Sequence, residues 1–237
     1  MNKHLVVGLG HKARAGKDSA AGFIKESFDN VVILHFADDL YEEVSNKNRK
    51  APLIQRSKSQ SEYIYSLLHS EHLGNDFVYS IRLQSEVPIL HDIFTQRGIN
   101  EYWGMDEKDA PMLQFWGTEY RRKQIDNYWV QKVHDKLETL FSSDQQYIIV
   151  IADTRFPNEV EFIQSLGSLY NCNGVYVKIE RLNEDGSVFI DPSRNHGHPS
   201  EVSLNNTPAF KILRAKTGDL ESLKIQAQKL IHSLLEN

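Results

Sequence analysis

The 237-residue chain has one cysteine, no long apolar run and no excess of positive charge. A single cysteine, Cys172, excludes an internal disulfide, so we expect a reducing, cytoplasmic setting. Charged residues interrupt every apolar stretch within a few positions, which excludes a membrane span and a membrane partner. The N-terminal apolar run is too short for a signal peptide and has no small-residue cleavage site, so we expect no targeting segment.

The charge balance narrows the function classes further. Asp and Glu total 32 against 27 Lys and Arg, giving a formal net charge of −5. This balance argues against a broad duplex-binding surface, so we expect no stable nucleic-acid binding. A hydrophobic fraction of 40% and a charged fraction of 25% are typical of a globular chain that is long enough to bury a substantial core.

Apolar, β-branched runs alternate with segments of helical periodicity along the chain. The alternation predicts an α/β domain with a mainly parallel sheet flanked by helices. We predict one domain over residues 1–237, with a helical insertion at about 46–110 and a polar lid at about 181–201. Strands are expected at residues 5–10, 31–36, 147–152 and 174–180, a further short apolar run at 210–213, and helices at 17–28, after 157 and at 220–235.

A basic, glycine-containing turn lies between the first strand and the first helix. At such a junction backbone N–H groups and a helix N-terminus face phosphate oxygens, and a lysine neutralises their charge. Gly16 allows close approach of the backbone and Lys17 is the cation. Either Asp18 or Ser19 is expected to meet Mg²⁺. The predicted phosphate-binding residues of this turn are Ala13, Arg14, Ala15, Gly16, Lys17, Asp18 and Ser19.

The turn departs from the general phosphate-loop pattern at two positions. His11 stands where the first glycine is usual, and Asp18 stands where Ser or Thr usually follows the lysine. The alternative is a basic turn whose Gly-Lys pair is accidental. Its position on the first strand and helix of an α/β pattern favours the functional interpretation.

Six short blocks occur in order along the chain, at residues 13–19, 36–40, 113–114 with 117–119, 128–130, 153–155 and 198–201. Together they resemble the bacteriophage deoxynucleoside monophosphate kinases. The resemblance implies a P-loop kinase fold, acting in the cytoplasm of an infected host, that uses ATP and Mg²⁺ to convert a deoxynucleoside monophosphate to its diphosphate. Small-molecule nucleotides are then the partners, and a homodimer is compatible with the resemblance alone.

Charged residues that follow the predicted strands are the candidates for catalysis. Asp153 ends a buried strand and is expected to contact Mg²⁺ through water or the acceptor; the alternative is an N-cap for the next helix. Arg155 is expected to clamp phosphate, because a guanidinium holds two oxygens at once; the alternative is a surface ion pair. Arg14, within the loop, is expected to reach the transferred phosphoryl group. Arg181, at the border of the lid, is expected to reach the phosphates of ATP.

A second group of residues is expected to bind the acceptor. Because neighbouring helical residues point about 100° apart, only one of Arg121 and Arg122 is expected to face the site, and the resemblance favours Arg122. Relatives often carry a lysine where this chain has Tyr41, which weakens the expectation for that helix. The candidate acceptor-binding residues are Asp38, Gln114, Gly117, Thr118, Arg122 and Arg155. For Gln114 and Thr118 the alternative is a helix cap or a satisfied buried amide.

Two other functions fit the same loop. One is a kinase for another acceptor, such as a modified nucleotide in DNA or a small metabolite. The other is a non-catalytic nucleotide-binding module. The block from Gln114 to Arg122 argues against the module, because a nucleotide switch has no use for a second anion site.

Overall fold

The computed structural model describes residues 4–44, 113–192 and 196–236. The predicted helical insertion at 46–110 therefore lies outside the described residues. Backbone contacts divide the chain into two units, one formed by Met1–Asp38 and Gly117–Asn237 and the other by Asp39–Trp116. The first unit contains the whole sheet and the predicted phosphate loop.

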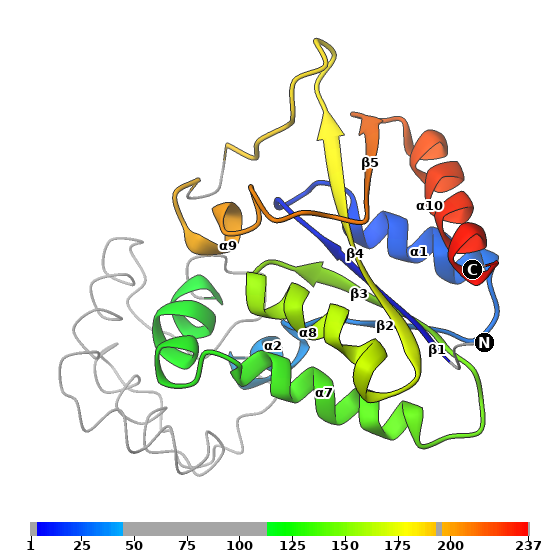
Figure 1. Ribbon diagram of the computed structural model, residues 1–237. Coiled ribbons are helices and arrows are strands. Elements are labelled where there is room, and N and C mark those ends of the chain that lie inside the picture. The colour runs from blue at the N-terminus through cyan, green and yellow to red at the C-terminus, as the bar shows by residue number, and fades with distance from the viewer. Residues whose placement is uncertain (1–3, 45–112, 193–195, 237) are drawn as a thin grey trace, which may run out of the picture. The chain divides into compact units, whose positions relative to one another are not determined.

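The first unit is built on a five-stranded sheet in which every neighbouring pair of strands is parallel (Figure 1). The strand order is β2-β3-β1-β4-β5, so β1 lies at the centre, between β3 and β4. The predicted α/β class and parallel sheet are confirmed. The strands are β1 (His4–Gly10), β2 (Val31–Leu34), β3 (Ile148–Thr154), β4 (Cys172–Leu182) and β5 (Lys211–Lys216).

One face of the sheet packs against α1 (Lys17–Ser27) and α10 (Leu220–Leu235), which lie side by side (Figure 1). Alternate residues of β1, Leu5, Val7 and Leu9, enter this core. Ala20 and Ile24 of α1 meet them because they fall on one side of the helix. The periodicity of the sequence predicted α10 with the bounds that the structure shows.

The opposite face carries α7 (Tyr128–Phe141) and α8 (Pro157–Leu169) (Figure 1). Val6 of β1 and Tyr176 of β4 are fully buried, so the central strands are covered on both sides. The remaining helical segments described are short: α2 (Asp38–Val44), the π-helix η3 (Phe115–Arg122) and α9 (Pro199–Val202). None of the helices in the described ranges is long and apolar enough to cross a bilayer.

The segment predicted as a lid contains regular structure at both ends. Arg181 and Leu182 complete β4, and Leu182 makes an antiparallel bridge to Val188. Pro199–Val202 form α9. The carboxyl ends of β1, β3 and β4 meet at one edge of the sheet, where open α/β sheets bind their ligands.

Close packing of α8 on β4 depends on Gly174. A Cβ at this position would lie 1.9 Å from the carbonyl oxygen of Ile163, a backbone atom that cannot rotate away. We expect Gly174→Ala to lower the free energy of unfolding by about 1–3 kcal/mol, because helix and strand must separate. Urea unfolding followed by circular dichroism measures the change.

Gly22 of α1 provides the matched control for that substitution. A Cβ there meets no atom within 4 Å. Gly22→Ala should therefore raise the free energy of unfolding, by up to about 1 kcal/mol, because alanine favours a helix interior. If Gly174→Ala proved as stable as the wild-type protein, the close approach of α8 to β4 would be wrong.

Candidate phosphate-binding site

Residues 11–16, the phosphate loop, connect the central strand β1 to α1. Gly16 has φ of 100°, a conformation that glycine adopts without strain. It is the N-cap residue of α1, and its position provides no side chain to cap the first turn. The amides of that turn and the helix dipole therefore face the loop, an arrangement that favours the binding of an anion.

Lys17 is the buried cation of this loop. Its side chain is 6% exposed, and its Nζ donates a hydrogen bond of 2.5 Å to the carbonyl oxygen of Lys12. Burial lowers the pKa of Lys17 well below its usual value, and the positive charge of Arg155 lowers it further. An oxyanion in the loop would offset both effects, since a negative neighbour favours the charged amine.

Asp153, at the end of β3, connects this strand to the turn that follows β2. Its Oδ1 accepts a hydrogen bond of 2.7 Å from the amide of Phe36. Its Oδ2 accepts a hydrogen bond of 2.9 Å from the amide of Ala37. Burial raises the pKa of the carboxyl, whereas His35 and the two amides lower it. The residue is close enough to Lys17 to raise the pKa of the amine. It does not cap α8, whose N-cap is Phe156.

Arg155 lies next to the loop and contacts it through Glu201. Its Nη1 donates to the carboxylate Oε1 of Glu201 at 3.0 Å and to the carbonyl oxygen of Ser200 at 3.2 Å. The other oxygen of Glu201 accepts a hydrogen bond of 3.0 Å from the amide of Ala13. Loop, arginine and α9 therefore form one hydrogen-bonded unit.

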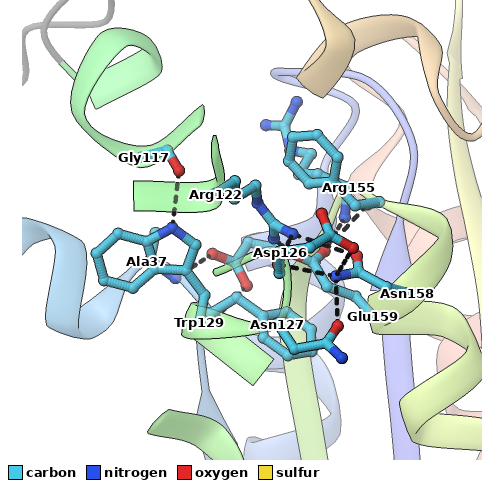
Figure 2. Close-up of polar contacts among 12 residues, drawn as sticks. Ala37, Gly117, Arg122, Asp126, Asn127, Trp129, Arg155, Asn158 and Glu159 are labelled. Carbon is cyan, nitrogen blue, oxygen red and sulfur yellow. Dashed lines mark hydrogen bonds and ion pairs between the residues drawn. The ribbon is translucent and has the colours of Figure 1, made fainter. Parts of the chain in front are cut away.

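Arg122 lies in a buried network at the start of α8 (Figure 2). Its guanidinium forms an ion pair with Glu159 and donates to Asn158 Oδ1 at 3.2 Å and to the carbonyl oxygen of Asp126 at 3.1 Å. It also stacks 3.9 Å from the ring centroid of Phe156. These contacts hold the N-terminus of α8 in place, and the predicted contact of Arg122 with the acceptor phosphate stays a prediction.

Glu159 is the acidic partner in the same network. Its Oε2 accepts hydrogen bonds from the amides of Arg155, at 2.6 Å, and Phe156, at 3.1 Å. Burial raises the pKa of Glu159 to about 7, although Arg122 and the two amides act in the opposite direction. Because Glu159 accepts a hydrogen bond from the amide of Arg155, the network fixes the backbone of the arginine that pairs with Glu201. Figure 2 shows Arg155 and Glu159 in this network.

The two other arginines proposed for ATP lie in different surroundings. Arg14 is an exposed loop residue whose Nε lies 3.2 Å from the Oδ2 of Asp191. Arg181 donates from Nε to Thr217 Oγ1 at 2.8 Å, and its guanidinium lies 4.0 Å from the ring centroid of Phe189. The structure thus places Arg14 at the loop, whereas Arg181 contacts Thr217, which follows β5, and Phe189, which lies in the segment after β4.

The predicted acceptor residues are only partly placed. The carbonyl oxygen of Gly117 accepts a hydrogen bond of 3.0 Å from Trp129 Nε1 (Figure 2). Thr118 follows it in η3. Gln114 belongs to the unit formed by residues 39–116, so the geometry of the loop does not bear on it. Its role in acceptor binding stays a prediction, as does that of Thr118.

His35, which follows β2, is a site residue that the sequence interpretation missed. Its Nε2 lies 3.6 Å from Asp18 Oδ1 and its Nδ1 lies 3.2 Å from Asp38 Oδ1. Asp38 Oδ2 also accepts a hydrogen bond of 3.1 Å from the amide of His35. The two carboxylates raise the pKa of His35 to about 10, so a cation joins the start of α1 to the start of α2.

Glu201 and Glu159 were missed as well. Glu201 stands in the block 198–201 that carries part of the family resemblance, so the sequence held a signal for it. Nothing in the sequence around Glu159 distinguishes it from any other glutamate in the first turn of a helix. Only the contact with Arg122 shows its importance.

The oxygen groups of the site suit Mg²⁺, which prefers carboxylates, phosphates and water. Asp18 is 87% exposed at the first turn of α1, next to Ser19. In the part of the chain that the structure describes, three potential ligands come within metal-ligand distance of one another only on α7, at His134, Asp135 and Glu138. Mg²⁺ at the loop would therefore be held by one or two protein oxygens together with phosphate and water.

The loop, its buried lysine and the arginine after β3 form a candidate phosphate-binding site at the carboxyl edge of a parallel α/β sheet. No family model matches the chain. A curated protein of Acanthamoeba polyphaga mimivirus, named "Putative deoxynucleotide monophosphate kinase", is 29% identical over 124 residues. That match covers 48% of this chain, and the chain spans about half the length of the relative, 56%.

A solved structure of a "putative kinase" from Chloroflexus aurantiacus is similar at a TM-score of 0.41 and 8% identity, with 99% of each chain covered. A likeness this slight does not bear on the fold or the reaction.

His11 has φ of 97°, the conformation of the glycine that usually stands at its position. Replacing it by alanine or glycine removes the same imidazole contacts, but only alanine keeps a Cβ in the left-handed region. We therefore expect His11→Gly to be more stable than His11→Ala by about 1 kcal/mol, which reverses the usual order. Chemical unfolding of the two variants measures the difference.

Lys12, the next residue, provides the control pair because its φ is not positive. Lys12→Gly should be less stable than Lys12→Ala, since glycine loses more freedom on folding. If His11→Ala matched or exceeded His11→Gly in stability, the backbone of the loop would differ from the one described.

The ion pairs of His35 predict a dependence of stability on pH. Its folded pKa, about 10, lies above the ordinary value of 6.5, so the contribution of His35 to stability is fully present below pH 6.5. It is lost as the pH rises through 10. The difference in unfolding free energy between the wild-type protein and His35→Gln should therefore narrow between pH 7 and pH 10. The expected change is on the order of 1 kcal/mol, because the side chain of His35 is 34% exposed and solvent screens its ion pairs.

His196→Gln serves as the control, since it changes an exposed histidine outside this network. Its difference from the wild-type protein should stay constant over the same range. A His35→Gln difference that grew or stayed level from pH 7 to pH 10 would contradict the paired histidine.

Proposed function

We propose that the protein is an ATP-dependent deoxynucleoside monophosphate kinase. It transfers the γ-phosphate of ATP to the 5′-phosphate of a deoxynucleoside monophosphate and releases ADP and a deoxynucleoside diphosphate. Small-molecule nucleotides are its partners. The observation that carries the proposal is the burial of Lys17 in the loop before α1, with Arg155 close enough to influence its pKa. The name of the mimivirus relative supports the choice of acceptor class.

The phosphate loop serves the donor. Phosphoryl transfer requires positioning of two anions and offset of the negative charge that builds between them. Loop amides and Lys17 would hold the β- and γ-phosphates, and Asp18 or Ser19 would hold Mg²⁺, which supplies further positive charge. Burial of Lys17 strengthens its electrostatic effect, because less water screens the amine.

Arg155 is assigned to the transferred phosphoryl group. Its Nη1 is used in contacts with α9, and its other donors make no hydrogen bond to a described residue. The free edge of the guanidinium is therefore available to phosphate oxygens. Arg14 would add a second cation from the loop. In this proposal Asp38, Gln114, Gly117, Thr118 and Arg122 bind the acceptor.

The test is transfer of labelled γ-phosphate from Mg·ATP to a panel of common and modified deoxynucleoside monophosphates. The wild-type protein should form a labelled diphosphate with at least one of them. Lys17→Met should lower kcat by about 100-fold or more, because it removes a buried charge from the transition state. Lys25→Met, at the exposed end of the same helix, should leave kcat unchanged.

Three outcomes separate the alternatives. Transfer to a nucleotide within DNA, and to no free monophosphate, would replace the acceptor class. Nucleotide binding without transfer to any acceptor would show a binding module. Full activity of Lys17→Met, with its fold verified by circular dichroism, would remove the loop from the mechanism.

A further inference from the structure

Glu201 connects two parts of the site that are far apart in the sequence. Its Oε2 accepts the hydrogen bond of the Ala13 amide, 188 residues earlier, while its Oε1 accepts that of Arg155 Nη1. The side chain is only 7% exposed, so little water competes for these contacts. A single carboxylate thus fixes the separation between the phosphate loop and Arg155.

The backbone that carries Glu201 is itself held on both sides. The Nδ1 of His198 accepts a hydrogen bond of 3.2 Å from the amide of Ser200, and Pro199 occupies the first helical position of α9. After α9, the carbonyl oxygen of Asn205 accepts a hydrogen bond of 3.0 Å from Lys178 Nζ. Lys178 pairs with Gly10 in the sheet, which anchors the segment beside the end of β1.

The negative charge of Glu201 offsets the repulsion between the two cations Lys17 and Arg155. Arg155 lowers the pKa of Lys17, so the two positive charges repel each other, and Glu201 raises that pKa again. With this carboxylate removed, repulsion would favour conformations in which Arg155, 21% exposed, turns toward solvent. Keeping a cation in place before the reaction is how a site stabilises a transition state without reorganising.

We propose that Glu201 is a positioning residue, which holds one edge of Arg155 against the phosphate loop so that the other edge meets the transferring phosphoryl group. The proposal rests on the proposed function. It assigns a role to the block 198–201 of the sequence. In this role Glu201 acts through Arg155, because its two oxygens accept hydrogen bonds from the arginine and from the Ala13 amide.

The first test is a double-mutant cycle in kcat. Glu201→Gln keeps the size of the side chain and removes its charge. We expect it to lower kcat by about 10- to 100-fold with a much smaller change in the KM for ATP, because Arg155 is misplaced in the transition state. In an Arg155→Gln background, the same substitution should cause little further loss.

A second test needs no acceptor. Mg·ADP with aluminium fluoride mimics the transferring phosphoryl group, and calorimetry measures its affinity. Glu201→Gln should bind this mimic about tenfold more weakly than the wild-type protein while binding Mg·ADP alone equally well. Glu138→Gln is the control, since it removes a carboxylate that accepts a hydrogen bond from the hydroxyl of Tyr170, at the carboxyl ends of α7 and α8 and outside the phosphate loop. It should change neither affinity.

The outcomes are distinct. If Glu201→Gln lowered kcat by the same factor in the wild-type and the Arg155→Gln background, Glu201 would not act through the arginine. Tighter binding of ATP by Glu201→Gln, with kcat intact, would show that the carboxylate blocks the loop instead. If the wild-type protein phosphorylates no monophosphate but its affinity for the mimic depends on Glu201, the acceptor class is wrong and the positioning role stands.

Discussion

The buried amine of Lys17 is the constraint around which this edge of the sheet is organised. An ammonium group taken out of water costs free energy unless acceptors and negative charge surround it. The carbonyl oxygen of Lys12 supplies the acceptor, and Asp18, Asp153 and Glu201 supply the charge. Each carboxylate comes from a different element, so satisfying one lysine brings α1, β3 and α9 together.

Two of these carboxylates, Asp153 and Glu201, and the nearby Glu159 also satisfy backbone amides that have no partner in a helix or strand. Asp153 accepts from the turn after β2, and Glu201 from the phosphate loop. Glu159 accepts from the segment that contains Arg155. Charge and backbone are therefore fixed together, so the cations at this edge of the sheet are held in place by the fold itself. A net charge of −5 is compatible with such a site because placement governs the local potential.

Much of the fold could be predicted because its signals are local. Alternating apolar runs and helical periodicity gave the strands and α10, and the Gly-Lys turn between β1 and α1 gave the loop. The roles of His35 and Glu159 could not be predicted, because each depends on a partner that only the folded chain brings near. Arg122 shows the same limit, since the sequence could not reveal that Glu159, Asn158 and Phe156 surround its guanidinium.

By itself, the sequence determined the class of the fold and the position of the glycine-containing loop between β1 and α1, because hydrophobic period and turn chemistry act over a few residues. Tertiary structure alone decided which charges face that loop. The order β2-β3-β1-β4-β5 brings the end of β3 beside the end of β1, and β4 returns α9 to the same edge. Glu201 meets Ala13 for this reason, across 188 residues that no local pattern spans.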